Sequence, residues 1–443
     1  MNKGSAVYRG LIILALFLVS LTPGHAATGK AAMVKIGLAQ NTAEIRLAAG
    51  GETALLDLGN GDPRALPWPG DQALFTAIGE LIYLNEIPVG RGPLLVVPVT
   101  DFVVWDEKRY RGELIIFNQN GTLNLVNRLS LENYLRGVVP KEVPAGWPMA
   151  ALKAQAIAAR TYTLANSERH RNDGFQLCAT THCQVYEGVD GEHPETDRAV
   201  LESDGLVITY NGRLISAVYH DTAGGYTKDA AEIWNYEVPY LKPVPAWDTG
   251  SPYSQWNRSI AWDELRTQLG KAFPELGKLR QLSPAAFSDD GRVIKLNLQG
   301  EAGERVITGE QFRQAVGLPS SHMKIGIAYG LEPLITLWWL YGQKNPAAII
   351  SEPEVPEPVM QEPEAAGEVA DWPQLQGKPP VRLVINGAGR GHGVGLSQWG
   401  AKRMAEAGYN ERQILEHFYP GAKLSKMGTV PDIAGEFVSN VSK

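Results

Sequence analysis

The sequence predicts an α+β fold, in which a β-rich N-terminal module precedes a long helix and a mixture of shorter elements. Residues 31–105 alternate short apolar runs, such as KIGLA and LLVVPV, with Gly/Pro clusters, which is typical of strands joined by turns. Residues 149–167 are instead rich in Ala, Leu, Lys, Gln and Arg, which favour a helix. The chain of 443 residues is long enough for two domains or one large one.

The first 26 residues predict a signal peptide. Two cationic residues precede the apolar run LIILALFLVSL, and Pro-Gly-His-Ala follows it. The run is too short to span a bilayer comfortably, although an uncleaved N-terminal anchor is the alternative. We therefore expect a secreted, extracytoplasmic protein of the cell envelope, which touches the membrane only if this segment is retained. The formal net charge of −7 argues against a nucleic-acid partner, which requires a basic face.

Two Asn-Gly pairs predict β-hairpins, because both residue types tolerate a positive φ. Asn120-Gly121 lies between GELIIFNQ and TLNLVNRL, and Asn211-Gly212 lies between LVITY and RLISAVY.

Shorter elements are predicted in the second half of the chain. They are a helix over 262–269 ended by Gly270, strands over 287–308, a helix over 310–316, a helix over 398–407 capped by Ser397, and a further helix begun by a capping box of Asn410 and Gln413.

Residues 345–380 stand apart from the rest. Eight of these 36 residues are proline, and Pro and Glu dominate the centre of the stretch. Such a composition cannot bury enough apolar surface to offset the entropy of ordering, so we expect a disordered, extended insertion. A simple interdomain linker is the alternative reading.

Glu142 is the leading candidate for a catalytic residue. Gly137, Pro140 and Pro144 bracket it, which predicts a constrained turn rather than a helical position. Pro148 then marks the start of the long helix, whose unpaired N–H groups and positive dipole end lie near. A carboxyl group that protonates a glycosidic oxygen needs apolar surroundings that keep it protonated near neutral pH.

The two cysteines, Cys178 and Cys183, allow three states, one of which is a pair of free thiols. They can form a disulfide in an exported protein, or they can bind zinc together with His182 and a fourth ligand, either His170 or His220.

Three segments carry a resemblance to a known family. They are GVVPKEVPAGWPMAALKAQAIAARTY (137–162), CATTHCQVYEG (178–188) and GRGHGVGLSQWGAKRMAEAGY (389–409). In this order they resemble the SpoIID/LytB family, which comprises sporulation protein D-type lytic transglycosylases and amidase enhancers. The resemblance implies a SpoIID-like catalytic domain whose first part covers 110–344 and whose C-terminal part covers 381–425. The Pro/Glu-rich stretch then becomes an insertion within that domain, and residues 381–385 become a strand that returns to the same sheet.

The resemblance also assigns roles to residues. It implies that Glu142 is the catalytic residue, and that some members bind zinc near the Cys-His-Cys motif. Helical spacing puts Lys153 and Arg160 on one face of their helix, and Gln155 and Tyr162 on another. The expected substrate-binding residues are Lys153, Gln155, Arg160, Tyr162, Tyr219, His220, His392 and Gln398.

The implied activity is that of a peptidoglycan lytic transglycosylase, which cuts the MurNAc–GlcNAc bond of glycan strands in cell-wall remodelling or sporulation-type engulfment. Peptide-stripped strands are one candidate substrate. One carboxylate suffices, because it can protonate the leaving oxygen and then accept the proton of the 6-hydroxyl, whereas most glycosidases use two. Second-acid candidates are Glu132, Glu187 and Asp221. The chemistry requires no cofactor, so a zinc ion would be structural.

Two alternatives remain open from the sequence. One is a non-catalytic enhancer that binds a cell-wall N-acetylmuramoyl-L-alanine amidase. The other is a structural wall-binding protein with a degenerate site.

Overall fold

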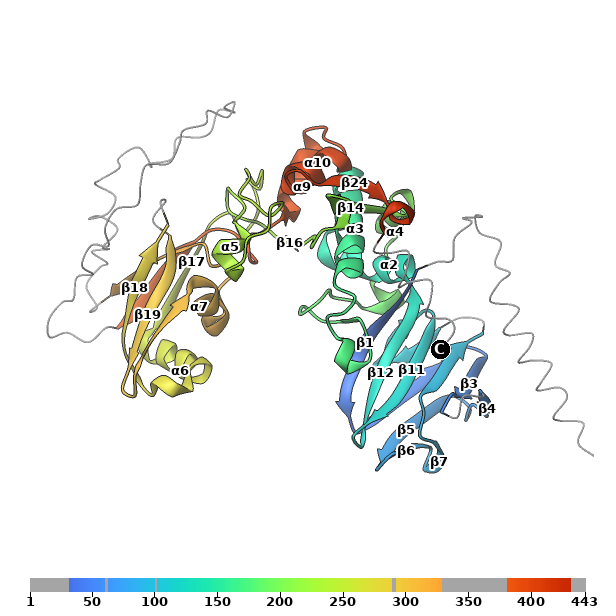
Figure 1. Cartoon of the computed structure of the whole chain (residues 1–443). Coiled ribbons are helices and arrows are strands. Elements are labelled where there is room, and N and C mark those ends of the chain that lie inside the picture. Colours follow the sequence, from blue (N-terminus) through green and yellow to red (C-terminus); the bar gives the residue numbers. More distant parts are fainter. Residues whose placement is uncertain (1–31, 60–62, 100–101, 289–291, 329–380, 432–443) are drawn as a thin grey trace, which may run out of the picture. The chain divides into compact units, whose positions relative to one another are not determined.

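The computed structural model describes residues 32–59, 63–99, 102–288, 292–328 and 381–431, and it confirms the predicted α+β class (Figure 1). The chain divides into two compact units, one of residues 1–216 with 423–443 and one of residues 217–422. The predicted signal peptide and Pro/Glu-rich insertion lie outside the described residues. Within the described ranges, every helix is too short or too polar to cross a bilayer.

The first unit contains a seven-stranded sheet that joins the N-terminal strands to the first predicted hairpin. Neighbouring strands are antiparallel, except that β13 runs parallel to β1. In spatial order the strands are β13 (Leu177–Cys178), β1 (Met33–Thr42), β12 (Thr122–Ser130), β11 (Glu113–Gln119), β8 (Leu94–Pro98), β3 (Thr53–Asp57) and β4 (Arg64–Leu66).

A six-stranded antiparallel sheet packs against the first, because β12 contacts β2 and β5 while β11 contacts β6. In spatial order its strands are β10 (Lys108–Tyr110), β9 (Val103–Trp105), β2 (Glu44–Ala49), β5 (Gln72–Ile78), β6 (Leu81–Leu84) and β7 (Ile87–Gly90). The β-rich character predicted for residues 31–105 is therefore confirmed. The same strands share sheets with residues 108–130, and the placing of the domain boundaries stays a prediction.

Both Asn-Gly pairs form the predicted hairpin turns. Asn120 and Gly121 have φ of 54° and 86° between paired Gln119 and Thr122. Asn211 and Gly212 have φ of 50° and 77° in the second hairpin.

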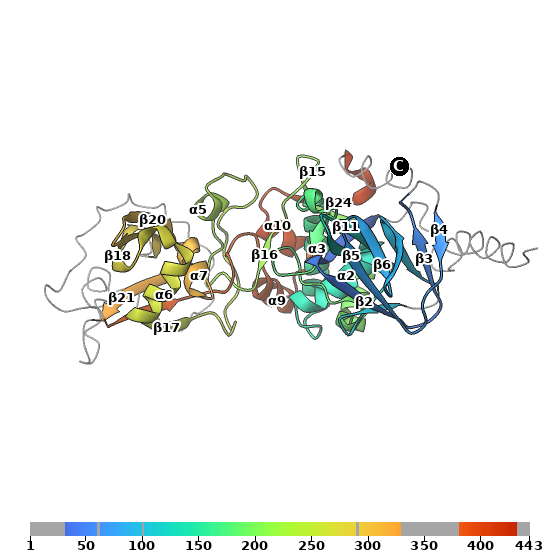
Figure 2. The ribbon, with the colours of Figure 1, turned by 90° about the horizontal axis from the view of Figure 1, so that it is seen from below.

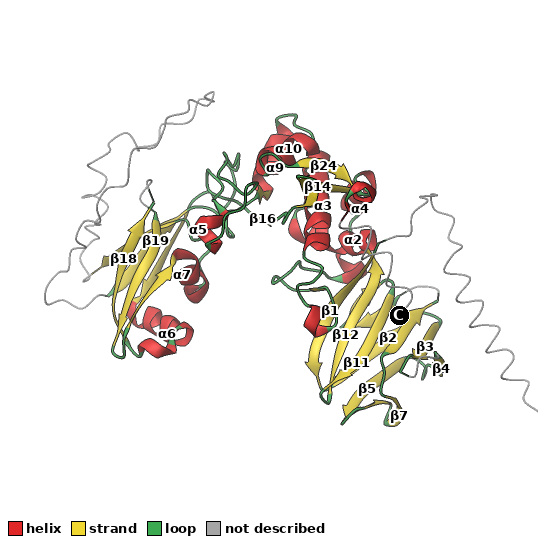
Figure 3. Ribbon diagram, viewed as in Figure 1, coloured by secondary structure: helices red, strands yellow, loops and turns green. Residues whose placement is uncertain are grey.

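Helices lie at one end of these sheets (Figure 3). Helix α3 packs against α2, α4 and a small sheet in which β14 is paired with β15 and with the C-terminal strand β24. The elements are α2 (Leu131–Glu142), α3 (Met149–Ala165), α4 (Pro194–Glu202), β14 (Leu206–Tyr210), β15 (Arg213–Leu214) and β24 (Lys423–Lys426), with 3₁₀ turns η1 (Arg171–Asp173), η2 (Gly188–Gly191) and η5 (Met427–Thr429).

One part of the second unit is built around a short parallel pair. Tyr219 pairs with Leu396, and His220 pairs with Ser397, which joins two segments that lie far apart in the sequence. Its elements are β16 (Tyr219–His220), α5 (Ala230–Trp234), β23 (Leu396–Ser397), α9 (Gln398–Glu406) and α10 (Glu411–Phe418). Ser397 caps α9, and Asn410 with Gln413 forms a capping box on α10, as predicted.

The rest of the second unit is two three-stranded sheets with a shared hydrophobic core, and α6 and α7 pack on these strands (Figure 2). The elements are β17 (Trp256–Ala261), α6 (Trp262–Ala272), η3 (Pro274–Leu276), β18 (Leu279–Phe287), β19 (Val293–Gly300), β20 (Glu304–Thr308), α7 (Gly309–Val316), β21 (Met323–Ala328) and β22 (Arg382–Gly387). Strand β22 returns between β17 and β21, as predicted for residues 381–385. Helix α6 continues past Gly270, which therefore does not end it.

Candidate functional site

Glu142 is the last residue of helix α2 and is partly buried. The expectation that it lies on a turn outside a helix is wrong. Pro140 removes one backbone donor from the last helical turn, but the buried face of α2, including Tyr134, Val138 and Val139, holds the helix against the core. The chain leaves the helix at Val143, whose φ of −137° and ψ of 145° are extended.

Gly137 lies within this helix and has a packing role. A Cβ atom built at Gly137 would come within 2.6 Å of the Tyr186 ring and 2.9 Å of the Gly188 carbonyl oxygen. The absence of a side chain therefore lets α2 approach the loop that follows the cysteines. That close contact brings the end of α2 and the cysteine loop into one neighbourhood.

Two buried tyrosines connect Glu142 electrostatically with the cysteine loop. Burial raises the pKa of Tyr134, and the nearby Cys183, Tyr186 and Glu142 add to the shift. Burial also raises the pKa of Tyr162. Glu142 and the two cysteines add to this rise, whereas the positive charge of Arg169 opposes it. The Tyr162 hydroxyl accepts a hydrogen bond of 3.0 Å from Arg169.

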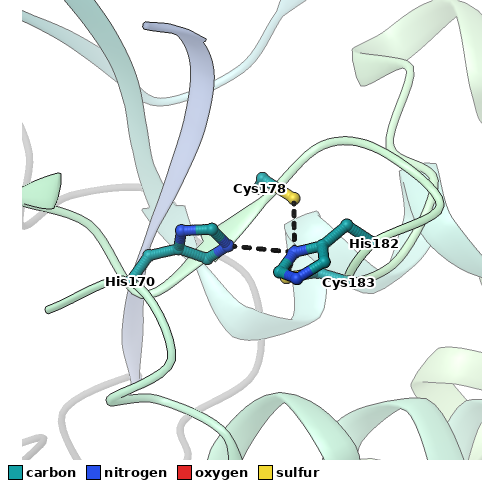
Figure 4. A group of neighbouring side chains, drawn as sticks. All are labelled: His170, Cys178, His182 and Cys183. Atoms are coloured by element: carbon teal, nitrogen blue, oxygen red, sulfur yellow. Dashed lines mark hydrogen bonds between the residues drawn. The ribbon is translucent and has the colours of Figure 1, made fainter. Parts of the chain in front are cut away.

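Four candidate metal ligands converge in the first unit: His170, Cys178, His182 and Cys183 (Figure 4). One donor atom from each lies within 4.8 Å of all the others. His182 Nδ1 lies 3.6 Å from Cys178 Sγ, 3.5 Å from Cys183 Sγ and 3.2 Å from His170 Nε2. The parallel pairing of β13 with β1 holds Cys178 at the edge of the large sheet.

This arrangement fits a tetrahedral zinc site. Zinc lies about 2.3 Å from thiolate sulfur and about 2.0 Å from imidazole nitrogen, so its ligand atoms are about 3.3 to 3.8 Å apart. The three distances measured from His182 Nδ1 fall in or next to that range. Asp173 Oδ2 lies 2.7 Å from His170 Nδ1, which leaves Nε2 to face the cluster, an outer-shell contact common for metal-binding histidines.

The environments of the two thiols differ: that of Cys178 favours the thiolate form that binds metal, whereas that of Cys183 does not. Burial opposes ionisation of Cys178, but hydrogen bonds from Thr180, His182 and Cys183 outweigh it and lower its pKa to about 6. Burial raises the pKa of Cys183 to about 11. The two sulfurs are free thiols here and are not joined in a disulfide. His170 occupies the fourth position, whereas His220 belongs to the second unit.

The four expected binding residues on α3 are placed differently from one another. Arg160 is fully buried and donates hydrogen bonds of 2.8 and 2.6 Å to the two carboxylate oxygens of Glu132. Lys153 pairs with Glu202 at 2.5 Å. Tyr162 faces Arg169 as described, and Gln155 is 1% exposed with no hydrogen-bond partner for its amide among the described residues. Arg160 thus has a structural position, and its contact with a substrate stays a prediction.

In the second unit the structure brings Tyr219, His220, His392 and Gln398 onto the joined segments around β16 and β23. The His220 and His392 rings are 5.5 Å apart. Burial lowers the pKa of His220 well below its usual value and that of His392 to about 4. Both histidines are therefore neutral near pH 7. His220 Nδ1 lies 3.1 Å from the Val394 carbonyl oxygen, and its Nε2 has no hydrogen-bond partner among the described residues.

Asp248 organises these segments, and sequence reasoning missed it. Its carboxylate is 2% exposed and accepts hydrogen bonds from the Thr222 hydroxyl at 2.6 Å and from the backbone N–H groups of residues 223, 224 and 225 at 2.5 to 3.0 Å. The Ser397 hydroxyl lies 3.5 Å away. An isolated Asp in a loop gives no sequence signal for this role, since its partners are more than 20 residues distant.

The candidate second acids in the first unit are engaged in ion pairs. Glu132 holds Arg160, and Glu187 lies 2.5 Å from Lys141 and 3.4 Å from Lys108. The hydrogen bond from Lys141 holds the pKa of Glu187 below its usual value, the opposite of what a general acid needs. Asp221 lies in the second unit, where burial raises its pKa.

The chain is similar to a family model and to several known proteins, most of which carry sporulation or amidase-enhancer names. Residues 119–210 match the family model described as SpoIID, stage II sporulation protein. An amidase enhancer of Bacillus subtilis is 31% identical over 307 residues, which cover 66% of this chain and 40% of that protein. Stage II sporulation protein D of Bacillus amyloliquefaciens is 27% identical over 68% of this chain and 76% of its own length. An uncharacterised protein of Brachyspira hyodysenteriae is 26% identical over 80% of this chain and 83% of its own length.

Proposed function

Because the chain belongs to the SpoIID/LytB family, we propose that it is an extracytoplasmic cell-wall protein that cleaves peptidoglycan glycan strands as a lytic transglycosylase. Glu142 is the general acid and base. It protonates the oxygen that leaves from the MurNAc–GlcNAc bond, and the resulting carboxylate then accepts the proton of the muramyl 6-hydroxyl as that oxygen closes on C1. The product is a 1,6-anhydromuramyl end, and no water is consumed.

The position of Glu142 carries this proposal. It ends a helix whose buried face packs in the core, and Tyr134 and Tyr162 lie within its electrostatic reach. The other candidate acids of the same unit, Glu132 and Glu187, are tied to cations. Transglycosylation needs only one carboxylate, whereas most glycosidases use two.

We also propose that zinc is the resident ion of the four-residue cluster and that its role is structural. His170, Cys178, His182 and Cys183 would hold it, and the two soft thiolates favour zinc over hard cations. The bound ion cross-links the segment after α3 to the loop beside β13 and so contributes folding energy. It supplies no step of glycan cleavage.

The experiment is digestion of purified glycan strands by the mature protein and by Glu142→Gln, with products read by mass spectrometry. Both peptide-bearing and peptide-free strands are supplied. The proposal expects anhydromuramyl ends from the wild type and at least a thousandfold slower formation by the variant, whose amide cannot donate an acidic proton. Equal cleavage by both proteins contradicts the role of Glu142, provided circular dichroism shows both folded.

An amidase-enhancing function is the second candidate, and the Bacillus subtilis relative of that name is the observation that favours it. Stimulation of an N-acetylmuramoyl-L-alanine amidase is measured with wild type and Glu142→Gln. If the variant stimulates the amidase as strongly as the wild type does, and the wild type cleaves no glycan, the protein is a non-catalytic enhancer.

A further inference from the structure

Lys228 is a buried residue that the proposed glycan cleavage does not use. It is 3% exposed, and its Nζ atom lies 3.0 Å from the Ser321 hydroxyl oxygen. Among the described residues, no Asp or Glu forms an ion pair with it. Lysine is almost never fully buried unless it is paired, so a lone buried amine beside a hydroxyl group is unusual.

Packing fixes the direction of this side chain. The Lys228 backbone N–H donates to the Gly393 carbonyl oxygen at 2.7 Å. A Cβ atom built at Gly393, whose φ is 79°, would lie 3.1 Å from Lys228 Cδ and 3.2 Å from its Cε. The glycine therefore lets the lysine stem lie against the backbone. The distance from Nζ to Ser321 Oγ falls in the range of about 2.6 to 3.2 Å at which a base activates a serine nucleophile.

Ser321 lines a hollow between α5, β19 and the start of α7. Ile233 and Val293 give this hollow an apolar wall, and Gly309, the first residue of α7, also lines it. The first N–H groups of a helix have no intrahelical partner, and the side chain of the Thr308 cap accepts only one of them. N–H groups in this place can stabilise an oxygen atom that becomes negative during acyl transfer.

Burial is the main reason that the pKa of Lys228 falls to about 8. The nearby Arg292 and Arg313 contribute to the fall, whereas Glu232 and Glu310 oppose it. The two glutamates line the hollow, but each is engaged by an arginine: Glu232 lies 3.3 Å from Arg292, and Glu310 lies 2.7 Å from Arg313.

Lys228 is therefore suited to act as a base. The two histidines that feel its charge, His220 and His392, are themselves neutral near pH 7. An exposed lysine has a pKa of about 10.4 and is almost fully protonated at pH 8. At that pH a large share of Lys228 is a neutral amine, which can accept the proton of a neighbouring hydroxyl group.

The size of the hollow and the single base indicate a small ester as the substrate. The hollow holds at most about 230 Å³, open solvent included, whereas pockets for drug-sized ligands hold about 300 to 1,000 Å³. A two-carbon acetyl group needs far less than that volume. An ester releases an alkoxide, which leaves more readily than the nitrogen of an amide and so demands less of a single base.

We propose that Ser321 and Lys228 form a nucleophile–base pair that hydrolyses short acyl esters, as a second activity of this chain. Neutral Lys228 accepts the hydroxyl proton while Ser321 Oγ bonds to the acyl carbon, and the carbonyl electron pair moves to oxygen. When the carbonyl re-forms, the alkoxide leaves and takes the proton from Lys228. Water then attacks the acyl-serine in the same way, which releases the carboxylic acid and restores the hydroxyl group.

The test labels and assays the full-length mature protein. A fluorophosphonate probe should label one residue per chain, and peptide mapping should find the label on Ser321. Hydrolysis of p-nitrophenyl acetate, corrected for the uncatalysed rate, should rise with pH with a midpoint near about 8, as the amine loses its proton. Ser321→Ala should abolish the label and slow ester hydrolysis by about a hundredfold or more.

Two lysine variants separate a base from a structural cation. Lys228→Arg keeps the charge but cannot lose its proton, and Lys228→Met keeps an unbranched stem without the amine. Both should slow hydrolysis by about a hundredfold. The matched controls are Ser259→Ala, at an exposed serine of the same unit, and Lys242→Met, at a lysine that pairs with Asp229. Both controls should keep the wild-type rate.

Three results would overturn the proposal: a wild-type protein that the probe does not label at Ser321, ester hydrolysis that survives Ser321→Ala, or full activity of Lys228→Arg. Circular dichroism shows whether the variants fold. If they do not, the labelling site of the wild-type protein decides the question alone. The proposal does not depend on glycan cleavage, because Glu142 belongs to the other unit.

Discussion

Glu132 holds the fully buried guanidinium of Arg160 through two hydrogen bonds of 2.8 and 2.6 Å. The same guanidinium donates to the carbonyl oxygens of Val200 and Leu206 at 3.2 Å each. One side chain thus joins α2, α3 and α4 to the start of β14. The relationship explains why an arginine stands in the middle of an otherwise Ala-rich helix.

Arg160→Met is expected to destabilise the protein. The substitution leaves Glu132 and two backbone carbonyl groups without their donor, and breaking such a buried pair costs about 3 kcal/mol. Urea unfolding followed by tryptophan fluorescence measures the change. The exposed-pair variant Arg171→Met should shift the unfolding free energy by less than about 0.5 kcal/mol. Equal effects of both changes would contradict the structural role of Arg160.

The four-ligand cluster predicts one zinc per chain after purification from zinc-containing medium. Elemental analysis should find that Cys178→Ser and His170→Ala lose the ion, whereas His193→Asn, at an exposed histidine outside the cluster, retains it. Asp173→Asn should weaken zinc binding by about 10- to 100-fold, because His170 loses its orienting carboxylate. Stoichiometric zinc in His170→Ala would show that another residue completes the site.

Asp248→Asn is expected to lower the stability of the second unit by about 2 to 4 kcal/mol, since an amide nitrogen would then face backbone donors in a buried site. Hydrogen exchange of residues 219–225 and 389–398 should accelerate together. Asp263→Asn, whose side chain is 94% exposed, is the control. Unchanged hydrogen exchange of these residues in Asp248→Asn would show that Asp248 does not organise the two segments.

The second unit should lose stability as pH falls. Burial lowers the pKa of His392 to about 4, while an unfolded histidine titrates near about 6.5. Between these values the unfolded chain binds more protons, so the stabilising contribution is complete above about pH 6.5 and is lost toward pH 4. From pH 7.5 to 5 the loss is about 2 kcal/mol for this histidine.

His392→Gln should reduce this pH dependence, as measured by denaturant unfolding at both pH values. His417→Gln, at a histidine that bonds the Pro245 carbonyl oxygen, should leave it in place. A pH profile that is identical in wild type and His392→Gln would contradict the assignment.

Local chemistry allowed much of the fold to be predicted. The Asn-Gly turns and the capping box of Asn410 and Gln413 are made by residues at most three positions apart, so their structures follow from the sequence. Two local predictions fail where packing opposes them: α2 runs through Pro140 to Glu142, and α6 runs past Gly270. In both cases the buried face of the helix outweighs a residue that disfavours helix.

The parts of the candidate site that depend on contacts between distant residues could not be predicted without the folded structure. The Cys-His-Cys motif is local, but the choice of His170 as the fourth ligand depends on the turn that brings it back to His182. Asp248 meets its partners across 23 or more residues. No spacing rule predicts such contacts.

The most direct test of Glu142-dependent transglycosylation is cleavage of glycan strands in water enriched in heavy oxygen, followed by mass spectrometry of the new muramyl ends. The account predicts anhydromuramyl ends that contain no heavy oxygen, because the 6-hydroxyl of the substrate closes on C1. Reducing ends that carry one heavy oxygen atom would show that water attacks, and would contradict the single-carboxylate mechanism.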